Sequence, residues 1–239
     1  MLQVKQLAIV NQSANQYLLQ PISFSLEPGE ILGVIGESGS GKSLLAHAML
    51  GQVPLGFKLQ GEIQATGSLA LSAQSASVFD PIKSVKQHLS RWLGRDTKHV
   101  QSSVADWDMW GIDREIAVSY RHQLSGGMAK RACLAQALVQ SPNYLLADEP
   151  CAGLDEVGAE RTYRQLRDKV DGDKLGLLVI SHNLRQLLHW ADRILVMRHG
   201  QLLDVTTPEA IKQGKCHIYS YALWQALPEN WEVSDVDAA

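Results

Sequence analysis

The sequence predicts an α/β fold that combines a mostly parallel sheet core, an antiparallel β subdomain and a helical insertion subdomain. Short apolar strands alternate with helical segments, which is typical of a parallel sheet covered on both faces. A glycine-rich loop lies between one of these strands and the helix that follows it. Residues 81–140 differ from the rest of the chain in charge and in helical spacing.

The composition is that of a globular protein and excludes several other classes. Of the 239 residues, 45% are hydrophobic and 20% are charged, which excludes disordered, collagen-like and coiled-coil chains. The net charge of −3 gives no support for nucleic acid as a partner of the whole chain. Three cysteines fit a reducing compartment. Residues 1–10 do not resemble a signal peptide and no run of about 20 apolar residues is found, so we expect another chain to hold this one at any membrane.

Periodicity and turn signals predict the elements in order. Residues 4–10 and 17–26 alternate polar and apolar residues, as antiparallel strands do, and residues 61–67 and 68–74 are predicted to form a second strand pair. Strands and helices alternate in the remainder, with strands at 30–35, 144–147, 175–181 and 193–197 and helices at 43–50, 129–140, 156–170 and 183–190.

Residues 81–140 are interpreted as a helical insertion into the α/β body. They include Trp92, Trp107 and Trp110, and glycine is scarce before Gly126. They carry nine Lys/Arg and five Asp/Glu, a net charge of +4, whereas the remainder carries 13 and 20, a net charge of −7. A positive charge of this size fits a solvated helix face or a binding patch, and we interpret it as a solvated face.

The first residues that point to a chemistry form the loop Gly36-Glu37-Ser38-Gly39-Ser40-Gly41-Lys42-Ser43. This is the G-x-x-x-x-G-K-S pattern, with the strand before it and the helix after it that a P-loop requires. Backbone N–H groups and the helix N-terminus converge on phosphates, and a Cβ at the glycines would block the turn. We expect Lys42 to contact the β- and γ-phosphates and the Ser43 hydroxyl to bind Mg²⁺.

An apolar strand that ends in two carboxylates supplies the second part of the predicted site. Asp148 ends the strand and is expected to hold Mg²⁺ directly or through water. Glu149 follows it and projects to the other side of the strand end. There it is expected to polarise the water that attacks the γ-phosphate.

A second anion-binding helix start is predicted at Ser125-Gly126-Gly127-Met128, although an ordinary Ser/Gly helix cap fits the same residues. One nucleotide does not need two such sites on one chain, whereas two chains that face each other would use both. We therefore expect the glycine-rich loop of one subunit to hold the phosphates. Ser125 and Gly127 of its partner are expected to close over the γ-phosphate.

With these motifs in this order, the chain resembles the ATP-binding cassette (ABC) ATPases over nearly its whole length. The resemblance implies a P-loop NTPase fold, ATP and Mg²⁺ as ligands, and a head-to-tail cassette dimer that ATP closes and hydrolysis opens. It places Gln74 in the Q-loop, Asp155 in the D-loop, and His182 at the switch histidine. The catalytic residues it implies are Glu149, His182, Lys42 and Gln74.

Some residues depart from the family pattern or have an open role. Met128 stands where Gln is commoner, Gly153 stands where Ala is common, and the Q-loop after Gln74 is short; these changes weaken the pattern but remove no expected catalytic residue. Cys151 is expected to be a buried, inert thiol. Tyr17 is either an adenine-stacking residue or a strand aromatic of the core.

The tail, from His217-Ile218-Tyr219-Ser220 to Pro228, is similar to the H-P-Y-T-x-x-L-x-x-x-x-P tail of the oligopeptide, dipeptide and nickel importer ATPases. This similarity implies two transmembrane permease subunits, a second and usually different cassette, and a periplasmic or extracellular substrate-binding protein. It also implies a peripheral position on the cytoplasmic face of the inner (plasma) membrane. We expect no iron–sulfur cluster, because only Cys216 lies near the tail and a cluster needs four thiolates, and no metal site at the histidines.

We expect one ABC ATPase domain over residues 1–239. Its predicted parts are the nucleotide-binding core at 1–80 and 141–205, the helical subdomain with the signature motif at 81–140, and a C-terminal helical tail at 206–239. The expected function is ATP hydrolysis that powers import of a solute of the peptide, nickel or metal-chelate class. Three alternatives stay open: a non-transport ABC ATPase that drives a soluble enzyme complex such as a phosphonate-degradation cassette, a module that uses ATP only to join chains, and a P-loop kinase.

Overall fold

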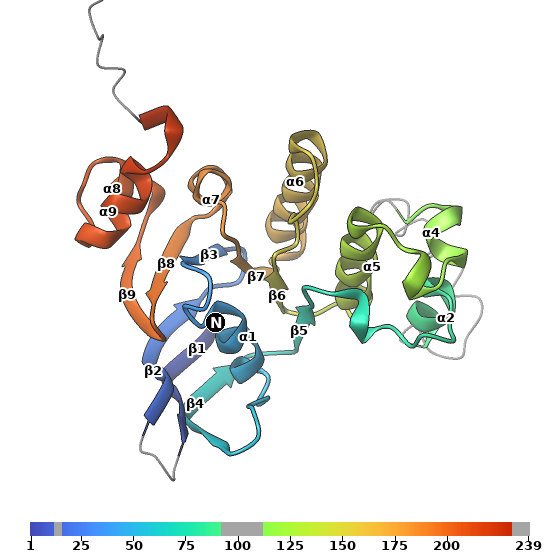
Figure 1. Cartoon of the computed structure of the whole chain (residues 1–239), viewed down its shortest axis with the longest axis horizontal. Coiled ribbons are helices and arrows are strands. Elements are labelled where there is room, and N and C mark those ends of the chain that lie inside the picture. Colours follow the sequence, from blue (N-terminus) through green and yellow to red (C-terminus); the bar gives the residue numbers. More distant parts are fainter. Residues whose placement is uncertain (12–15, 92–111, 231–239) are drawn as a thin grey trace, which may run out of the picture.

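The computed structural model describes residues 1–11, 16–91 and 112–230, which form two β-sheets and a set of helices (Figure 1). The strands are β1 (Leu2–Asn11), β2 (Gln16–Leu26), β3 (Ile31–Gly36), β4 (Phe57–Ala65), β5 (Leu69–Ser72), β6 (Tyr144–Asp148), β7 (Gly176–Ile180), β8 (Arg193–Arg198) and β9 (Gln201–Thr206). The helices are α1 (Lys42–Met49), α2 (Val85–Ser90), α4 (Arg114–Val118), α5 (Gly126–Leu138), α6 (Glu156–Asp173), α7 (Leu184–Trp190), α8 (Pro208–Lys212) and α9 (Ile218–Gln225). Short 3₁₀ turns lie at Ala76–Val78, Arg121–Gln123 and Pro228–Asn230.

The larger sheet has six strands in the order β5-β6-β7-β3-β8-β9, and all neighbours are parallel except β8 and β9. The inner residues of its central strands are apolar because both faces of the sheet are covered. On β3, Ile31 and Ile35 pack toward one buried cluster, whereas Leu32 and Val34 pack toward the other. This alternation follows from the two-residue period of a strand. The predicted mostly parallel core is therefore confirmed.

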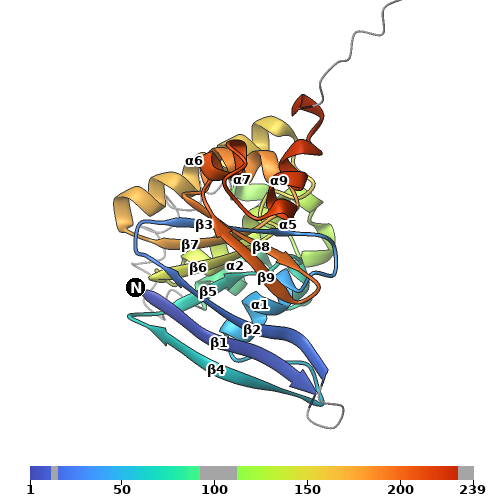
Figure 2. The same cartoon turned by 90° about the vertical axis from the view of Figure 1, so that its left-hand side faces the viewer.

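The smaller sheet is antiparallel, has the order β2-β1-β4 and lies on the other side of α1 from the large sheet (Figure 2). The predicted pairing of residues 61–67 with residues 68–74 is wrong. Ile63 of β4 lies opposite Val4 of β1, whereas Leu69 of β5 lies beside Tyr144 of β6 in the large sheet. Gly67 turns the chain from one sheet to the other with a φ of 117°, a conformation that favours glycine.

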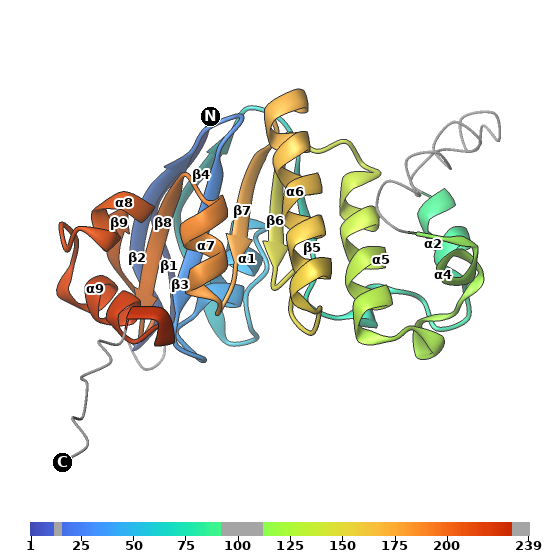
Figure 3. The same ribbon diagram turned by 90° about the horizontal axis from the view of Figure 1, so that it is seen from above.

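Three helices, α5, α6 and α7, cover the face of the large sheet that is turned away from α1 (Figure 3). The insertion contributes α2 and α4, which pack together, and α2 also contacts α5. Trp92, Trp107, Trp110 and His99 lie outside the described residues. Helices α8 and α9 follow β9 and pack against each other, and α8 also contacts α7. Among the described residues, no helix has both the length and the apolar composition needed to cross a membrane.

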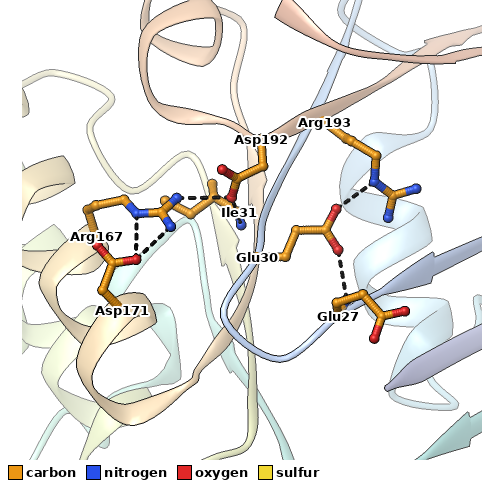
Figure 4. Close-up of polar contacts among 7 residues, drawn as sticks. All are labelled: Glu27, Glu30, Ile31, Arg167, Asp171, Asp192 and Arg193. Atoms are coloured by element: carbon orange, nitrogen blue, oxygen red, sulfur yellow. Dashed lines mark hydrogen bonds and ion pairs between the residues drawn. The ribbon is translucent and has the colours of Figure 1, made fainter.

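Two carboxylate–arginine groups, Glu30 with Arg193 and Arg167 with Asp171 and Asp192, lie at the start of β3, the end opposite the glycine-rich loop (Figure 4). Glu30 Oε1 accepts a hydrogen bond of 2.6 Å from Arg193 Nε, and Arg193 also donates to the carbonyl oxygen of Ser25 at 2.8 Å. The second carboxylate oxygen of Glu30 accepts from the Glu27 amide at 2.7 Å. Because Ser25 belongs to β2 and Arg193 to β8, this group joins the antiparallel sheet to the parallel one.

We expect Arg193→Met to lower the free energy of unfolding by about 2 kcal/mol. The Glu30 side chain is only 10% exposed, so loss of its partner leaves a carboxylate with little access to water. A fully buried pair costs about 3–5 kcal/mol when one partner is removed, and the 32% exposure of Arg193 reduces that figure. Urea unfolding measures the change.

The matched control is Arg164→Met, which breaks an exposed i,i+4 pair with Glu160 on α6. Their side chains are 69% and 45% exposed, so this loss should be about 0.3–0.5 kcal/mol. Equal losses in the two variants would contradict a joining role for Arg193.

Candidate nucleotide-binding and catalytic site

The glycine-rich loop connects β3 to α1, and three of its glycines are required by its shape. Gly39 and Gly41 have φ values of 79° and 98°. A Cβ on Gly36 would collide with the carbonyl oxygen of Met197 and would lie 2.7 Å from Ser40 Oγ. The Ser40 amide donates to the Glu37 carbonyl oxygen at 3.1 Å, which closes the first turn of the loop. The loop is therefore compact before any ligand is considered.

Lys42 is buried beneath this loop with 9% of its surface exposed. Its ammonium group donates to the carbonyl oxygens of Gly36 at 2.8 Å and Glu37 at 3.0 Å. Burial lowers the pKa of Lys42, and the nearby carboxylates of Glu149 and Asp148 oppose that shift. The ammonium thus lies between the loop and two carboxylates, where an anionic ligand would find a desolvated positive charge.

Asp148 and Glu149 lie at the carboxyl end of β6. Asp148 is 4% exposed, and its Oδ1 atom has no hydrogen-bond partner among the described residues. A buried carboxylate oxygen without a partner is rare in proteins, and hard cations such as Mg²⁺ prefer oxygen ligands of this kind. Glu149 has a φ of 53°, in the left-handed region, and its amide donates to the Ile180 carbonyl oxygen at 3.0 Å. Strained backbone of this kind is often found at functional sites.

His182 follows β7 and completes a pair with Glu149. The distance between His182 Nδ1 and Glu149 Oε2 is 2.8 Å. The Glu149 side chain is 11% exposed, whereas that of His182 is 71% exposed. The histidine therefore orients the carboxylate from the solvent side of the cleft.

The loop, Lys42 and the Glu149–His182 pair line a cleft of about 580 Å³. The residues that line it are Ser38, Gly39, Gly41, Lys42, Ser43, Leu44, Gln74, Glu149, Ala152, Ile180 and His182. Four predicted catalytic residues from separate parts of the sequence thus meet in one cleft. Sequence reasoning missed one contact at its edge, in which Lys130 of α5 donates from Nζ to the Gln74 carbonyl oxygen at 2.6 Å.

Two predicted motifs do not line this cleft. Ser125 caps α5, where its hydroxyl accepts from the Met128 amide at 3.3 Å. Asp155 caps α6 and accepts from the Gly158 amide at 2.9 Å. Both residues are exposed, so within one chain they act as helix caps.

The sequence also predicted the environments of two single residues, Cys151 and Tyr17. Cys151 is buried, and burial raises its pKa to about 12, so it is the inert thiol that was expected. Tyr17 lies on β2 with 37% of its surface exposed, which does not fit a core aromatic. Its contact with adenine stays a prediction.

The comparison with known proteins agrees with this geometry. A family model described as ABC transporter matches residues 19–152, which is more than half of the chain. The chain belongs to the ABC transporter family. As an ABC ATPase it binds and hydrolyses ATP, which confirms the predicted enzyme class. The solved structures that share its fold confirm the predicted fold class.

Curated relatives of this ABC ATPase belong to import systems. The metal-staphylopine import system ATP-binding protein CntD of Staphylococcus aureus (strain NCTC 8325 / PS 47) is 31% identical, and the match covers 92% of this chain and 90% of the relative. The dipeptide transport ATP-binding protein DppD of Escherichia coli (strain K12) is 29% identical over 92% of this chain and 75% of the relative. These relatives agree with the predicted role in ATP-powered solute import.

Solved structures share the fold of this ABC ATPase. A dimeric ATP-binding cassette in a post-hydrolysis state, bound to ADP and Pi, has a TM-score of 0.76 at 19% identity and covers 87% of this chain and 99% of its own. An inward-facing transporter described as of putative metal-chelate type has a TM-score of 0.71 at 23% identity, covering 88% of this chain and 84% of its own.

Proposed function

We propose that this ABC ATPase binds Mg²⁺-ATP in the cleft, closes on a second cassette to hydrolyse it, and thereby powers solute import through two permease subunits. The observation that carries this proposal is that Lys42 and the Glu149–His182 pair line one cleft, with the unpartnered carboxylate of Asp148 close to Lys42. The Lys42 ammonium and the loop amides would stabilise the charge that develops on the phosphoryl group. Glu149 would accept a proton from the attacking water, and His182 would keep its carboxylate oriented.

The residues present fit a magnesium ion. The unpartnered Oδ1 of Asp148 and the hydroxyl of Ser43, which lies next to Lys42 on α1, would hold it. When bound, Mg²⁺ neutralises charge on the β- and γ-phosphates. Gln74 is exposed and lines the cleft. It would contact the bound ligand and move with it, and this movement would be transmitted to the insertion.

A second cassette is proposed because two of the predicted motifs, at Ser125 and Asp155, do not line this chain's own cleft. Ser125 and Gly126 are exposed at the start of a 13-residue helix, and Asp155 is exposed at the start of α6. A helix start with free backbone N–H groups is suited to bind phosphate. These residues would close over the γ-phosphate held by the partner cassette, which is proposed to be a different chain.

The proposed cargo is a peptide or a metal chelate, with nickel included. Its support comes from the import systems to which the relatives belong and from the tail, which is similar to that of peptide and nickel importers. A substrate-binding protein outside the membrane would select the cargo. The cassette would lie on the cytoplasmic face of the membrane, and its parts are proposed to follow the boundaries given above: 1–80 with 141–205, then 81–140, then 206–239.

The test is to purify the tagged chain from membranes and identify the proteins that accompany it. We expect two multi-span permeases and a second cassette, and the reconstituted complex should take up peptide or metal chelate only with ATP. Purification with a soluble enzyme complex and no permease would contradict transport and would favour the phosphonate-degradation type of cassette.

A further inference from the structure

The tail helix α9 touches the phosphate-binding loop directly, although 182 residues separate them along the chain. Tyr219 donates from its hydroxyl to Glu37 Oε1 at 2.9 Å. The same carboxylate oxygen lies 3.8 Å from Arg198 Nε. The Arg198 guanidinium carbon lies 4.8 Å from the centre of the Tyr219 ring, within the range of a cation–π contact. Tail, strand β8 and loop thus meet at one side chain.

Hydrogen bonds to β9 hold the part of the tail that contains Tyr219 in place. Ser220, the residue after Tyr219, and His217, two residues before it, both donate to Asp204 of β9. The His217 amide donates to Asp204 Oδ2 at 2.8 Å, and the Ser220 hydroxyl donates to the same atom at 2.7 Å. Ser220 is 1% exposed. Tyr219 is therefore held at the loop by contacts within the chain.

Glu37 is the point at which the tail can influence phosphate binding. Its carbonyl oxygen accepts from Lys42 Nζ at 3.0 Å and from the Ser40 amide at 3.1 Å, so its backbone, together with that of Gly36, holds the Lys42 ammonium in place. Its side chain carries a negative charge in a loop that must bind a polyanion. The hydroxyl of Tyr219 and the guanidinium of Arg198 hold this charge toward the tail and partly offset it.

We propose that Tyr219, supported by Arg198, is a positioning residue that makes the tail helix a structural support of the phosphate-binding loop. The proposal rests on the nucleotide site proposed above. Without the hydroxyl, Glu37 is free to turn its charge toward the phosphates, and the loop is less well organised for binding. The loss should weaken ATP binding and leave the chemical step unchanged, because Tyr219 donates to Glu37 of the loop, whereas Glu149 is paired with His182.

The first test compares Tyr219→Phe with Tyr221→Phe. Tyr221 lies on the same helix, is also half-buried and stacks on Trp224, but its hydroxyl makes no hydrogen bond within the described residues. We expect Tyr219→Phe to raise the Kd and KM for Mg²⁺-ATP about 3- to 10-fold with kcat unchanged, and Tyr221→Phe to change none of them. Thermal unfolding should be the same for both variants. Equal effects of the two variants, or none from Tyr219→Phe, would overturn the proposal.

The second test asks whether Tyr219 acts through Glu37. Glu37→Gln, Tyr219→Phe and the double variant form a cycle, read out as the Kd for fluorescent ATP. If the proposal holds, Tyr219→Phe has little effect on the Kd in the Glu37→Gln background, because the charge that the Tyr219 hydroxyl restrains is no longer there. Fully additive effects would mean that Tyr219 acts elsewhere and would overturn it. The two proposals can fail separately. If the wild-type protein binds no ATP, the proposed nucleotide site is wrong. If the wild type and Tyr219→Phe bind ATP equally tightly, only the proposed role of the tail is wrong.

Discussion

Glu149→Gln should greatly reduce ATP turnover and leave ATP binding intact. The substitution keeps the size of the side chain but removes the carboxylate that lines the cleft and is proposed to take a proton from water. The amide can still face His182, whose ring nitrogen lies 2.8 Å from the carboxylate in the wild type. Lys42 and the loop are unchanged, so the nucleotide still binds.

The expected loss in kcat is about 10²- to 10⁴-fold, the usual contribution of a general base. Phosphate release measures turnover, and equilibrium binding of labelled ATP measures affinity. With hydrolysis blocked, ATP should hold the cassettes together, which light scattering detects as an increase in mass. The matched control is Glu160→Gln, whose carboxylate is 45% exposed on α6. Wild-type phosphate release by Glu149→Gln would contradict its role.

Lys42→Ala should remove ATP binding itself. The ammonium is the cation placed beneath the loop, where burial has already removed much of its hydration. The variant loses two charge-assisted phosphate contacts, worth about 3–4 kcal/mol together. The Kd for ATP should therefore rise about 10²- to 10³-fold.

Equilibrium binding of fluorescent ATP checks this expectation for Lys42→Ala. The control is Lys58→Ala, which removes an exposed positive charge from β4. A Lys42→Ala protein that binds ATP with wild-type affinity would show that the triphosphate lies elsewhere. A Lys58→Ala protein with equally weakened binding would show that only overall charge matters.

The local parts of this fold could be predicted from the sequence, whereas the pairing of distant strands could not. The loop and α1 follow from the motif, because its glycines and the lysine have fixed conformational and chemical requirements. The strand at β5 was predicted, but its partner was not, since Leu69 pairs with Tyr144 through contacts that local alternation does not encode. Strand β9 was not predicted at all, because its half-buried residues show no clear alternation.

In the candidate site, too, the residues in local motifs could be predicted, whereas a contact between distant segments could not. Asp148 and Glu149 were predicted from the apolar strand that they follow, whereas Gln74 and His182 were predicted from the resemblance to the ABC ATPases. The contact between Tyr219 and Glu37 was not found, because it joins two segments that only the packing of α9 on β9 brings together. The tyrosine in the H-P-Y-T-like tail was a signal, but its spacing does not say what it touches.

The most direct measurement uses ATP that carries a photoreactive group on the terminal phosphate. In the complex of two cassettes, Lys42→Ala empties the loop of this chain and leaves the loop of the partner cassette intact. If the triphosphate is shared between cassettes, Ser125–Met128 of the Lys42→Ala chain will still be labelled, by nucleotide that the partner holds. If labelling of this segment disappears together with Lys42, the nucleotide is held within one chain and the account is wrong.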